Sequence, residues 1–390
     1  MKTTFDSSQV LTSTVDPVTP TVVKTSQRLL SIDALRGFDM LFISGAGTFL
    51  ALLEGKTGWT WVDTLARNMH HASWDSHITF YDLIFPIFLF LAGASLTFSI
   101  NKELANGKSK AYLYRKAFWR MLIFMGIDIV YKNPGISFFE PSNIRYLGIL
   151  GRIGIAGLIT TFIYLNFSKI GRISWVAAML LLYYAALLYF PVPGYGPGDL
   201  SSMETNFVGW FDRTFQPGRL VNKIYDENGM AAQVPAHCLA IMGAFAGDFL
   251  RSDWKESKKI KFLLLSGLVC LGLGLLWGLH LRVSRHLWSS SFILVSGGWA
   301  FLFITLFYWL IDVLKFQKWA FFFKVIGINS LATYLLYYFI DFYHSSRLIF
   351  YGLYAPVPQQ WHKVIEATGA LTLVWLVLYF LYRKKVFIKV

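Results

Sequence analysis

The sequence predicts an all-α membrane protein, a polytopic bundle of about ten transmembrane helices with both termini in the cytoplasm. Of the 390 residues, 55% are hydrophobic and only 15% are charged. The mean hydropathy of +0.49 lies far from the composition of soluble domains. Apolar segments of about 20 residues, the length that crosses the hydrocarbon core as a helix, recur along the chain. Basic residues gather in short connections that all fall on one side of these segments.

Each apolar segment is expected to be a helix, because backbone polar groups find no water inside a bilayer. The predicted spans are residues 34–54, 80–100, 117–131, 146–167, 174–190, 233–250, 262–281, 289–313, 319–342 and 364–382. The third and fifth are short for a span. Residues 31–390 are expected to form one transmembrane domain.

The basic residues orient this bundle. They cluster after every second span, at residues 102–116, 169–172, 251–261, 315–318 and 383–389. The positive-inside rule places these connections and both termini in the cytoplasm. Residues 1–30 are rich in Ser, Thr and Val and lack an apolar core with a cleavage site, so we expect a flexible cytoplasmic tail. On the outer side, the long connection 191–231 is rich in Pro and Gly, and its length is typical of a binding loop.

The net charge of +14 does not indicate nucleic acid as a partner. The basic residues alternate with apolar runs, which is the topology signal of a membrane protein. The two cysteines, Cys238 and Cys270, lie inside apolar runs without metal-ligand spacing, and we expect buried free thiols.

The densest group of polar side chains lies at the outer end of the second span. It contains His70, His71, Asp75 and His77. A histidine near its ordinary pKa takes and returns a proton at neutral pH and also acts as a nucleophile toward an acyl donor. Asp75, four residues after His71, is placed to orient one imidazole. The histidine spacing is not that of a metal site, and no metal is expected.

Charged residues also occur inside the predicted spans, where they are costly and usually face a cavity or an ion partner. Asp82 in the second span is the main example, and we expect it to line a cavity. The other charged residues of this kind could either form structural ion pairs or have a functional role, and both readings are open. These residues are Asp33, Arg36, Asp39, Arg145 and Arg152.

Small and polar residues inside the spans favour contacts between helices. Glycine recurs at every third residue from 148 to 157 within an apolar helix, which favours close helix packing over a phosphate-binding loop. Asn329 and Ser330 lie in the middle of the ninth span, where they either bond to a neighbouring helix or line a cavity.

Several motifs occur in a specific order along the chain. They are Ser31-Ile-Asp-Ala-Leu-Arg-Gly37, His71-Ala-Ser-Trp74, Asp82-Leu-Ile-Phe-Pro86, Gly151-Arg-Ile-Gly154, Pro191-Val-Pro-Gly194, Tyr225-Asp-Glu-Asn-Gly229, Leu287-Trp-Ser-Ser290, Ile328-Asn-Ser330 and Leu381-Tyr-Arg-Lys-Lys385. This ordered set resembles the heparan-α-glucosaminide N-acetyltransferase family of membrane acyltransferases, over nearly the whole chain beyond the N-terminal tail. The sequence departs from the family pattern at Asp75 and Ser76. It also has Gly47 in place of an asparagine and Tyr337 in place of a histidine.

The resemblance implies transmembrane acetylation. Acetyl-CoA is supplied from the cytoplasm, and the acetyl group reaches an amino sugar on the far side of the membrane. The active-site histidine of the family falls on His71, which the charge pattern places on the outer side. His71 then acts either as a base or as an acetyl acceptor, with Asp75 or Asp82 orienting it.

The same resemblance implies binding residues and a location. We expect Trp74, Asn329 and Ser330 to bind the acceptor, and basic residues to meet the phosphates of acetyl-CoA; these are Lys116, Arg145 and Arg152. A bacterial member in the inner membrane is expected, because the chain lacks a long N-terminal luminal extension. A homodimer is compatible with such a bundle.

Two other functions stay open. The opening Asp-x-x-Arg-Gly motif also fits O-acetylation of a surface polysaccharide, and an intramembrane carboxylate with a basic inner face also fits a sugar transporter. A transporter would favour broken helices at matching positions of two repeats, and the sequence shows no clear internal repeat of that kind. An acetylase consumes acetyl-CoA, whereas a carrier moves sugar without it.

Overall fold

The computed structural model describes residues 29–74, 77–135, 140–354 and 356–388, so Asp75, Ser76 and most of the expected tail lie outside the described residues. Within these ranges the regular structure is helical, with two isolated β-bridges. The longer helices are α1 (Leu30–Leu41), α4 (Phe80–Ala105), α5 (Lys110–Lys132), α6 (Ile149–Asn166), α7 (Lys169–Tyr189), α9 (Gln233–Arg251), α10 (Glu256–Gly278), α11 (Ser290–Phe307), α12 (Ala320–Ile328), α13 (Ser330–Phe339) and α15 (His362–Arg383). The shorter ones are α2 (Gly47–Ala51), α3 (Thr60–Arg67), α8 (Phe207–Phe215) and α14 (Phe342–Ile349).

Six helical segments among the described residues are long and apolar enough to cross a membrane: Phe80–Ala105, Ile149–Asn166, Lys169–Tyr189, Glu256–Gly278, Ser290–Val313 and Gln359–Arg383. Helices α12 and α13 meet at a bend of 69° and would supply a seventh span if they cross together. The all-α class is confirmed. The number of ten spans and the cytoplasmic position of both termini stay predictions.

Two predicted spans are interrupted where their sequence stays apolar. The first predicted span, 34–54, passes through a π-helix at Phe42–Ala46, in which Gly45 has a φ of 118°. The ninth, 319–342, bends at Asn329, which lies between α12 and α13. Both breaks expose backbone groups that a continuous helix would satisfy, so each needs a local partner.

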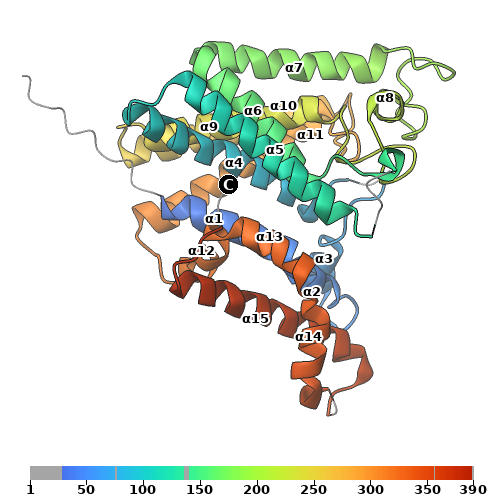
Figure 1. Ribbon diagram of the computed structural model, residues 1–390, viewed down its shortest axis with the longest axis vertical. Helices are drawn as coiled ribbons and strands as arrows, with labels where there is room; N and C mark the ends of the chain where they lie inside the picture. The colour runs from blue at the N-terminus through green and yellow to red at the C-terminus, as the bar shows by residue number, and fades with distance from the viewer. Residues whose placement is uncertain (1–28, 75–76, 136–139, 355, 389–390) are drawn as a thin grey trace, which may run out of the picture.

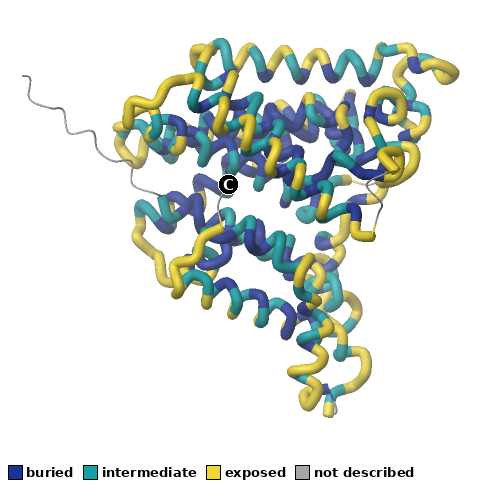
Figure 2. Tube along the Cα trace, viewed as in Figure 1, coloured by how far each residue is buried: buried dark blue, intermediate teal, exposed yellow. Residues whose placement is uncertain are grey.

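The helices lie in two groups side by side (Figure 1). One contains α4 to α11, and the other contains α1, α12, α13 and α15, with α14 extending from it. Figure 2 shows the buried residues concentrated inside the groups and many exposed residues on the outer helices α7 and α15. Large apolar side chains are exposed on α7 and α10, including Leu181, Leu182, Leu265 and Leu276, as expected for helices that face lipid.

Glycines allow the closest helix crossings. A Cβ atom on Gly37 of α1 would lie 1.8 Å from the Phe323 carbonyl oxygen of α12, and one on Gly93 of α4 would lie 1.9 Å from the Ala240 carbonyl oxygen of α9. The packing role expected for the glycine row at 148–157 is confirmed at Gly154, whose Cβ would lie 2.9 Å from the Cα of α5 residue 121. It is wrong for residue 157, where a Cβ would meet nothing within 4 Å.

Candidate active site

Asp82 is held at the start of α4 by a capping box. The Thr79 backbone N–H and hydroxyl donate to its Oδ2 atom, at 3.1 Å and 3.2 Å, and the Ala72 backbone N–H donates to the same oxygen at 3.2 Å. The sequence specifies this geometry, because a Thr that is followed three residues later by an acidic residue is a helix-start pattern. The carboxylate side chain has no exposed surface, and the backbone donors fix its orientation.

The other oxygen of Asp82 holds His71. The His71 Nδ1 atom lies 2.8 Å from Asp82 Oδ1. Since an ionised carboxylate only accepts, Nδ1 carries the proton and donates, and Nε2 is left with its lone pair. The His71 side chain is 48% exposed while Asp82 is fully buried. A buried carboxylate behind an accessible imidazole is the arrangement that general-base and nucleophilic catalysis use.

Arg285 joins this pair to the long loop 191–231. Its Nε atom lies 3.0 Å from Asp82 Oδ1, and its two terminal nitrogens lie 3.0 Å and 3.2 Å from the carboxylate oxygens of Glu227. Burial raises the pKa of Glu227, but the charge and hydrogen bonds of Arg285 outweigh it and leave the pKa below its ordinary value. His71, Asp82, Arg285 and Glu227 thus form one continuous chain from the cavity to the loop 191–231, which we call the His71 relay.

His286 and Trp74 support the segment that carries His71. The His286 Nε2 atom lies 3.1 Å from the Ala72 carbonyl oxygen, so that nitrogen donates. Burial and the neighbouring Arg285 lower the pKa of His286 below its ordinary value, which keeps the ring neutral. The Trp74 ring packs 5.3 Å from the His286 ring, with the Arg282 guanidinium 5.4 Å from its centroid.

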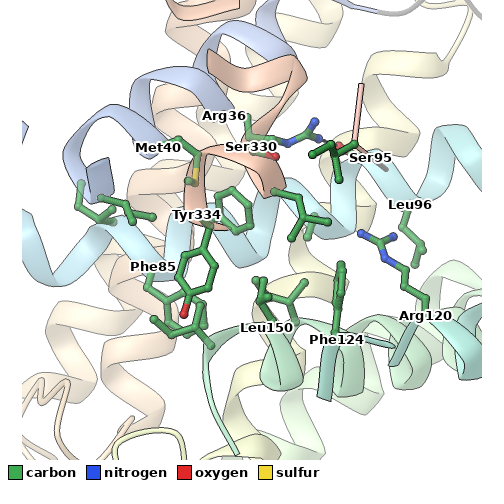
Figure 3. A pocket seen from close by; sticks show the side chains of 18 of the residues that line it. Arg36, Met40, Phe85, Ser95, Leu96, Arg120, Phe124, Leu150, Ser330 and Tyr334 are labelled. Carbon is green, nitrogen blue, oxygen red and sulfur yellow. Dashed lines mark hydrogen bonds between the residues drawn. The ribbon is translucent and has the colours of Figure 1, made fainter. Parts of the chain in front are cut away.

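A cavity of about 420 Å³ begins at His71 and runs between the two groups of helices. His71 and Tyr81 line one end, and the middle is apolar, with Phe85 and Leu150 among its walls. Arg36 and Arg120 line it together with Ser95, which accepts a hydrogen bond from Arg36. Figure 3 shows these three side chains gathered away from Phe85.

The cavity is long. Ser99, which also lines it, lies seventeen residues after Asp82 in α4, a rise of about 25 Å at 1.5 Å per residue. Arg36 and Arg120 come close enough to repel each other electrostatically. Two cations that face one cavity favour an anionic group between them.

The structure places the other expected site residues differently. Arg145 forms a two-point ion pair with Asp226, at 3.0 Å and 2.8 Å, and Arg152 is fully buried with its guanidinium 4.2 Å from the Trp288 ring centroid. Lys116 pairs with Glu103 at 2.7 Å on the surface. The residues that line the cavity do not include Lys116, Arg145 or Arg152.

The two polar residues of the ninth predicted span have separate surroundings. Asn329 donates to the Val386 carbonyl at 3.0 Å and accepts from the Ile388 N–H at 3.2 Å, so it ties the C-terminal segment to the break between α12 and α13. Ser330 lines the cavity. Among the described residues, no group of three or more His, Cys, Asp or Glu side chains is arranged to hold a metal ion.

Membrane-length helices around a cavity that ends in a carboxylate-bound histidine define an integral, multi-pass membrane protein with an enzyme-like site. A family described as a domain of unknown function (DUF5009) matches residues 28–138. The human heparan-α-glucosaminide N-acetyltransferase (Homo sapiens) is 27% identical over 96% of this chain and 62% of its own length. The mouse protein of the same name (Mus musculus) is 25% identical over 94% of this chain and 61% of its own length.

The chain is thus related at the family level to the heparan-α-glucosaminide N-acetyltransferases, as the ordered motifs predicted. It spans about three fifths of the length of the curated relatives that it matches.

Proposed function

We propose that this protein is a transmembrane acetyltransferase that moves the acetyl group of cytoplasmic acetyl-CoA to an amino sugar on the extracytoplasmic side of a bacterial inner membrane. The observation that carries the proposal is the cavity, with a His–Asp pair at one end and two arginines along it. The names of the related human and mouse proteins support the reaction class.

The cavity fits the shape of an acyl-CoA. The phosphates of the donor would lie at Arg36 and Arg120, since guanidinium groups bind phosphate oxygens in pairs. The apolar middle would hold the pantetheine arm, and the thioester would reach His71. Lys116, one turn before Arg120 on α5, is proposed as a further phosphate contact at the cytoplasmic mouth. Arg145 is paired with Asp226 and Arg152 packs on Trp288, so these two arginines are proposed to hold the outer loop and not the phosphates.

His71 Nε2 has two routes to transfer. In the first it attacks the thioester carbonyl, so that the C–N bond forms, the C–S bond breaks and CoA leaves as a thiolate; the acceptor amine then displaces the imidazole and loses a proton. In the second it removes the proton while the amine attacks the thioester carbonyl directly, so that the C–N bond to the amine forms, the C–S bond breaks and CoA leaves as a thiolate. In both routes Asp82 holds Nδ1–H and stabilises the positive charge that develops on the ring. Asp75 is proposed to assist at the outer mouth.

The decisive experiment is transfer from radiolabelled acetyl-CoA to a panel of amino sugars by the purified protein in detergent. Label in the sugar amide, with one CoA thiol released per acetyl group, is expected. Label in an ester of a sugar hydroxyl would assign O-acetylation instead. No acetyl-CoA binding and no release of CoA would overturn the proposal.

A carrier function has one structural feature in its favour. The bend of 69° between α12 and α13 resembles the discontinuous helices that form transporter sites. A carrier would move labelled sugar into vesicles without acetyl-CoA, and that uptake would replace the acetyltransferase proposal.

Replacement of Arg120 by glutamine is expected to raise the KM for acetyl-CoA roughly tenfold or more and to leave kcat within about threefold, because a charge-assisted phosphate contact is lost far from the reacting atoms. Lys110→Gln, which removes one charge from the exposed start of the same helix, is the matched control. Initial rates over a range of acetyl-CoA concentrations separate KM from kcat. An unchanged KM in Arg120→Gln would show that the phosphates of acetyl-CoA do not bind in this part of the cavity.

The link from the outer loop to His71 predicts a pH dependence. The pKa of Glu227 is lowered in the folded protein, so its contribution to loop stability is present above the ordinary glutamate pKa of about 4.3 and is lost as the pH falls through the lower folded value. His286 acts in the same direction, because its lowered pKa means that protonation favours the open loop. Proteolysis within 191–231 is therefore expected to accelerate as the pH falls below about 6.5, the ordinary histidine pKa, and further below about 4.3.

Glu227→Gln tests that link. It is expected to make loop cleavage fast at neutral pH and to lower kcat by roughly tenfold, since Arg285 loses one of its two carboxylates. Cleavage that is slow and pH-independent in the wild type would contradict a role for this ion pair in holding the loop.

A further inference from the structure

Tyr81 lines the cavity next to His71, and two more tyrosines lie close to the π-helix at Gly45, two residues before the glycine that the Tyr81 ring contacts. The Tyr81 ring of α4 lies 4.7 Å from the His71 ring, centroid to centroid, and lines the cavity. The hydroxyl groups of Tyr343 and Tyr337 come within 3.3 Å and 3.5 Å of the point where a Cβ atom on Gly45 would lie. These side chains come from α4, α13 and α14, and we call them the tyrosine cluster.

Two glycines make the space for this cluster. A Cβ atom on Gly47 would lie 2.5 Å from Cε2 of the Tyr81 ring, so a side chain there would displace the ring. Gly45 has a φ of 118°, in the left-handed region, inside the π-helix that follows α1. The Tyr337 hydroxyl donates to the Ser44 carbonyl and so satisfies one backbone group of that opening. The helix break and the glycine after it therefore contact all three tyrosines.

We propose that the tyrosine cluster is the subsite that binds and selects the acceptor sugar, with the Tyr81 ring as its platform and the Tyr343 hydroxyl as a polar contact. This inference rests on the proposed acetyltransferase function. A pyranose ring has an apolar C–H face that packs on an aromatic ring, while its hydroxyls need donors and acceptors at the edge. Tyr81 contacts the imidazole, so an amine on a sugar that lies on Tyr81 would be next to His71.

Trp74 is less suited to that role in this structure. Its ring already packs against His286 and Arg282, and it belongs to the apolar cluster below the outer loop. The residues that line the cavity include Tyr81 but not Trp74. The platform for the acceptor is thus on α4, on the same helix as Asp82, which fixes its distance to the reacting histidine.

The test compares acceptor and donor kinetics in Tyr81 variants. Tyr81→Ala is expected to raise the KM for the acceptor roughly tenfold or more, while the Kd for acetyl-CoA stays within about threefold, because the phosphate contacts lie at the other part of the cavity. Tyr81→Phe keeps the platform and is expected to cost less than about threefold. Tyr338→Ala, on the lipid-facing side of α13 against Tyr131, is the matched control and should leave both values unchanged.

Gly47→Ala gives an independent measurement. The added Cβ displaces the Tyr81 ring, so the variant is expected to raise the acceptor KM as Tyr81→Ala does. In the double variant the two effects should not add, because the ring that Gly47 accommodates is gone. Additive effects, or an unchanged acceptor KM in Tyr81→Ala with normal transfer, would overturn the proposed acceptor subsite and leave the proposed acetyltransferase function standing. Absence of any transfer and of acetyl-CoA binding in the wild type would instead overturn the proposed function.

Discussion

Replacement of His71 by alanine is expected to abolish acetyl transfer, with a loss of roughly 10²–10⁴-fold or more in kcat. The imidazole is the accessible end of the His71 relay, and Asp82 behind it has no exposed surface. Without the ring, neither an attack on the thioester nor proton removal from the amine has a base at this end of the cavity. The Kd for acetyl-CoA should change little, because the proposed phosphate contacts at Arg36 and Arg120 remain.

The adjacent histidine is the control. His70 is exposed, and its Nε2 atom lies 3.9 Å from Glu54 rather than in the cavity. His70→Ala is expected to keep at least about half of the wild-type rate, as surface substitutions away from a site usually do. Normal transfer by a folded, membrane-inserted His71→Ala protein would contradict the assignment of His71 as the catalytic base or acetyl acceptor. An acid quench after labelled acetyl-CoA, without acceptor, distinguishes the two routes: protein-bound label that depends on His71 shows an acetyl-histidine.

Apolar length predicted much of the helical bundle. The segments expected at 80–100, 146–167, 174–190, 262–281, 289–313 and 364–382 each coincide with a helix of membrane length. The π-helix at Gly45 and the bend at Asn329 were not predicted, because both occur inside runs that remain apolar on either side. A hydropathy pattern reports burial in lipid, and it carries no signal for a change in backbone hydrogen bonding.

Part of the candidate site was likewise predicted from the sequence, and part of it was not. The pattern of polar residues pointed to His71 and Asp82, which lie eleven positions apart and hydrogen-bond to each other. It missed Arg285 and Glu227 as members of the site, although both belong to the outer connections. Their ion pair joins residues that are 58 positions apart in the sequence, and a single sequence contains no signal for such a pairing. The available indication was only that both are charged residues in connections between the predicted spans.

The donor end of the cavity shows why residue type alone was insufficient. Arg36, Arg145 and Arg152 all stand out as arginines in or near apolar spans. The structure pairs Arg145 with Asp226 and packs Arg152 on Trp288, whereas Arg36 lies 3.6 Å from Asp33 and also lines the cavity. Arg36 differs from the other two in facing the cavity, and how the helices pack sets which arginine does so.

Asp82→Asn is expected to lower kcat by roughly 10²–10⁴-fold while the protein stays folded. Asparagine has the shape of aspartate, but only its amide oxygen accepts, so it cannot serve His71 on one side and the Thr79 and Ala72 donors on the other. His71 loses the carboxylate that keeps the proton on Nδ1, and Nε2 is no longer held in the basic tautomer. Arg285 also keeps only Glu227 as its ion partner.

Kinetic measurements can show whether the loss of activity in Asp82→Asn arises in the chemical step or in acetyl-CoA binding. The Kd for acetyl-CoA is expected to stay within about threefold, since Asp82 lies away from the arginines. Asp82→Glu restores the charge with a longer side chain and is expected to regain part of kcat, whereas Asp82→Asn is not. Equal losses in both variants would indicate that the capping geometry, and not the charge on Asp82, controls His71. A loss confined to acetyl-CoA binding would move Asp82 out of the reaction and make it a structural residue of α4.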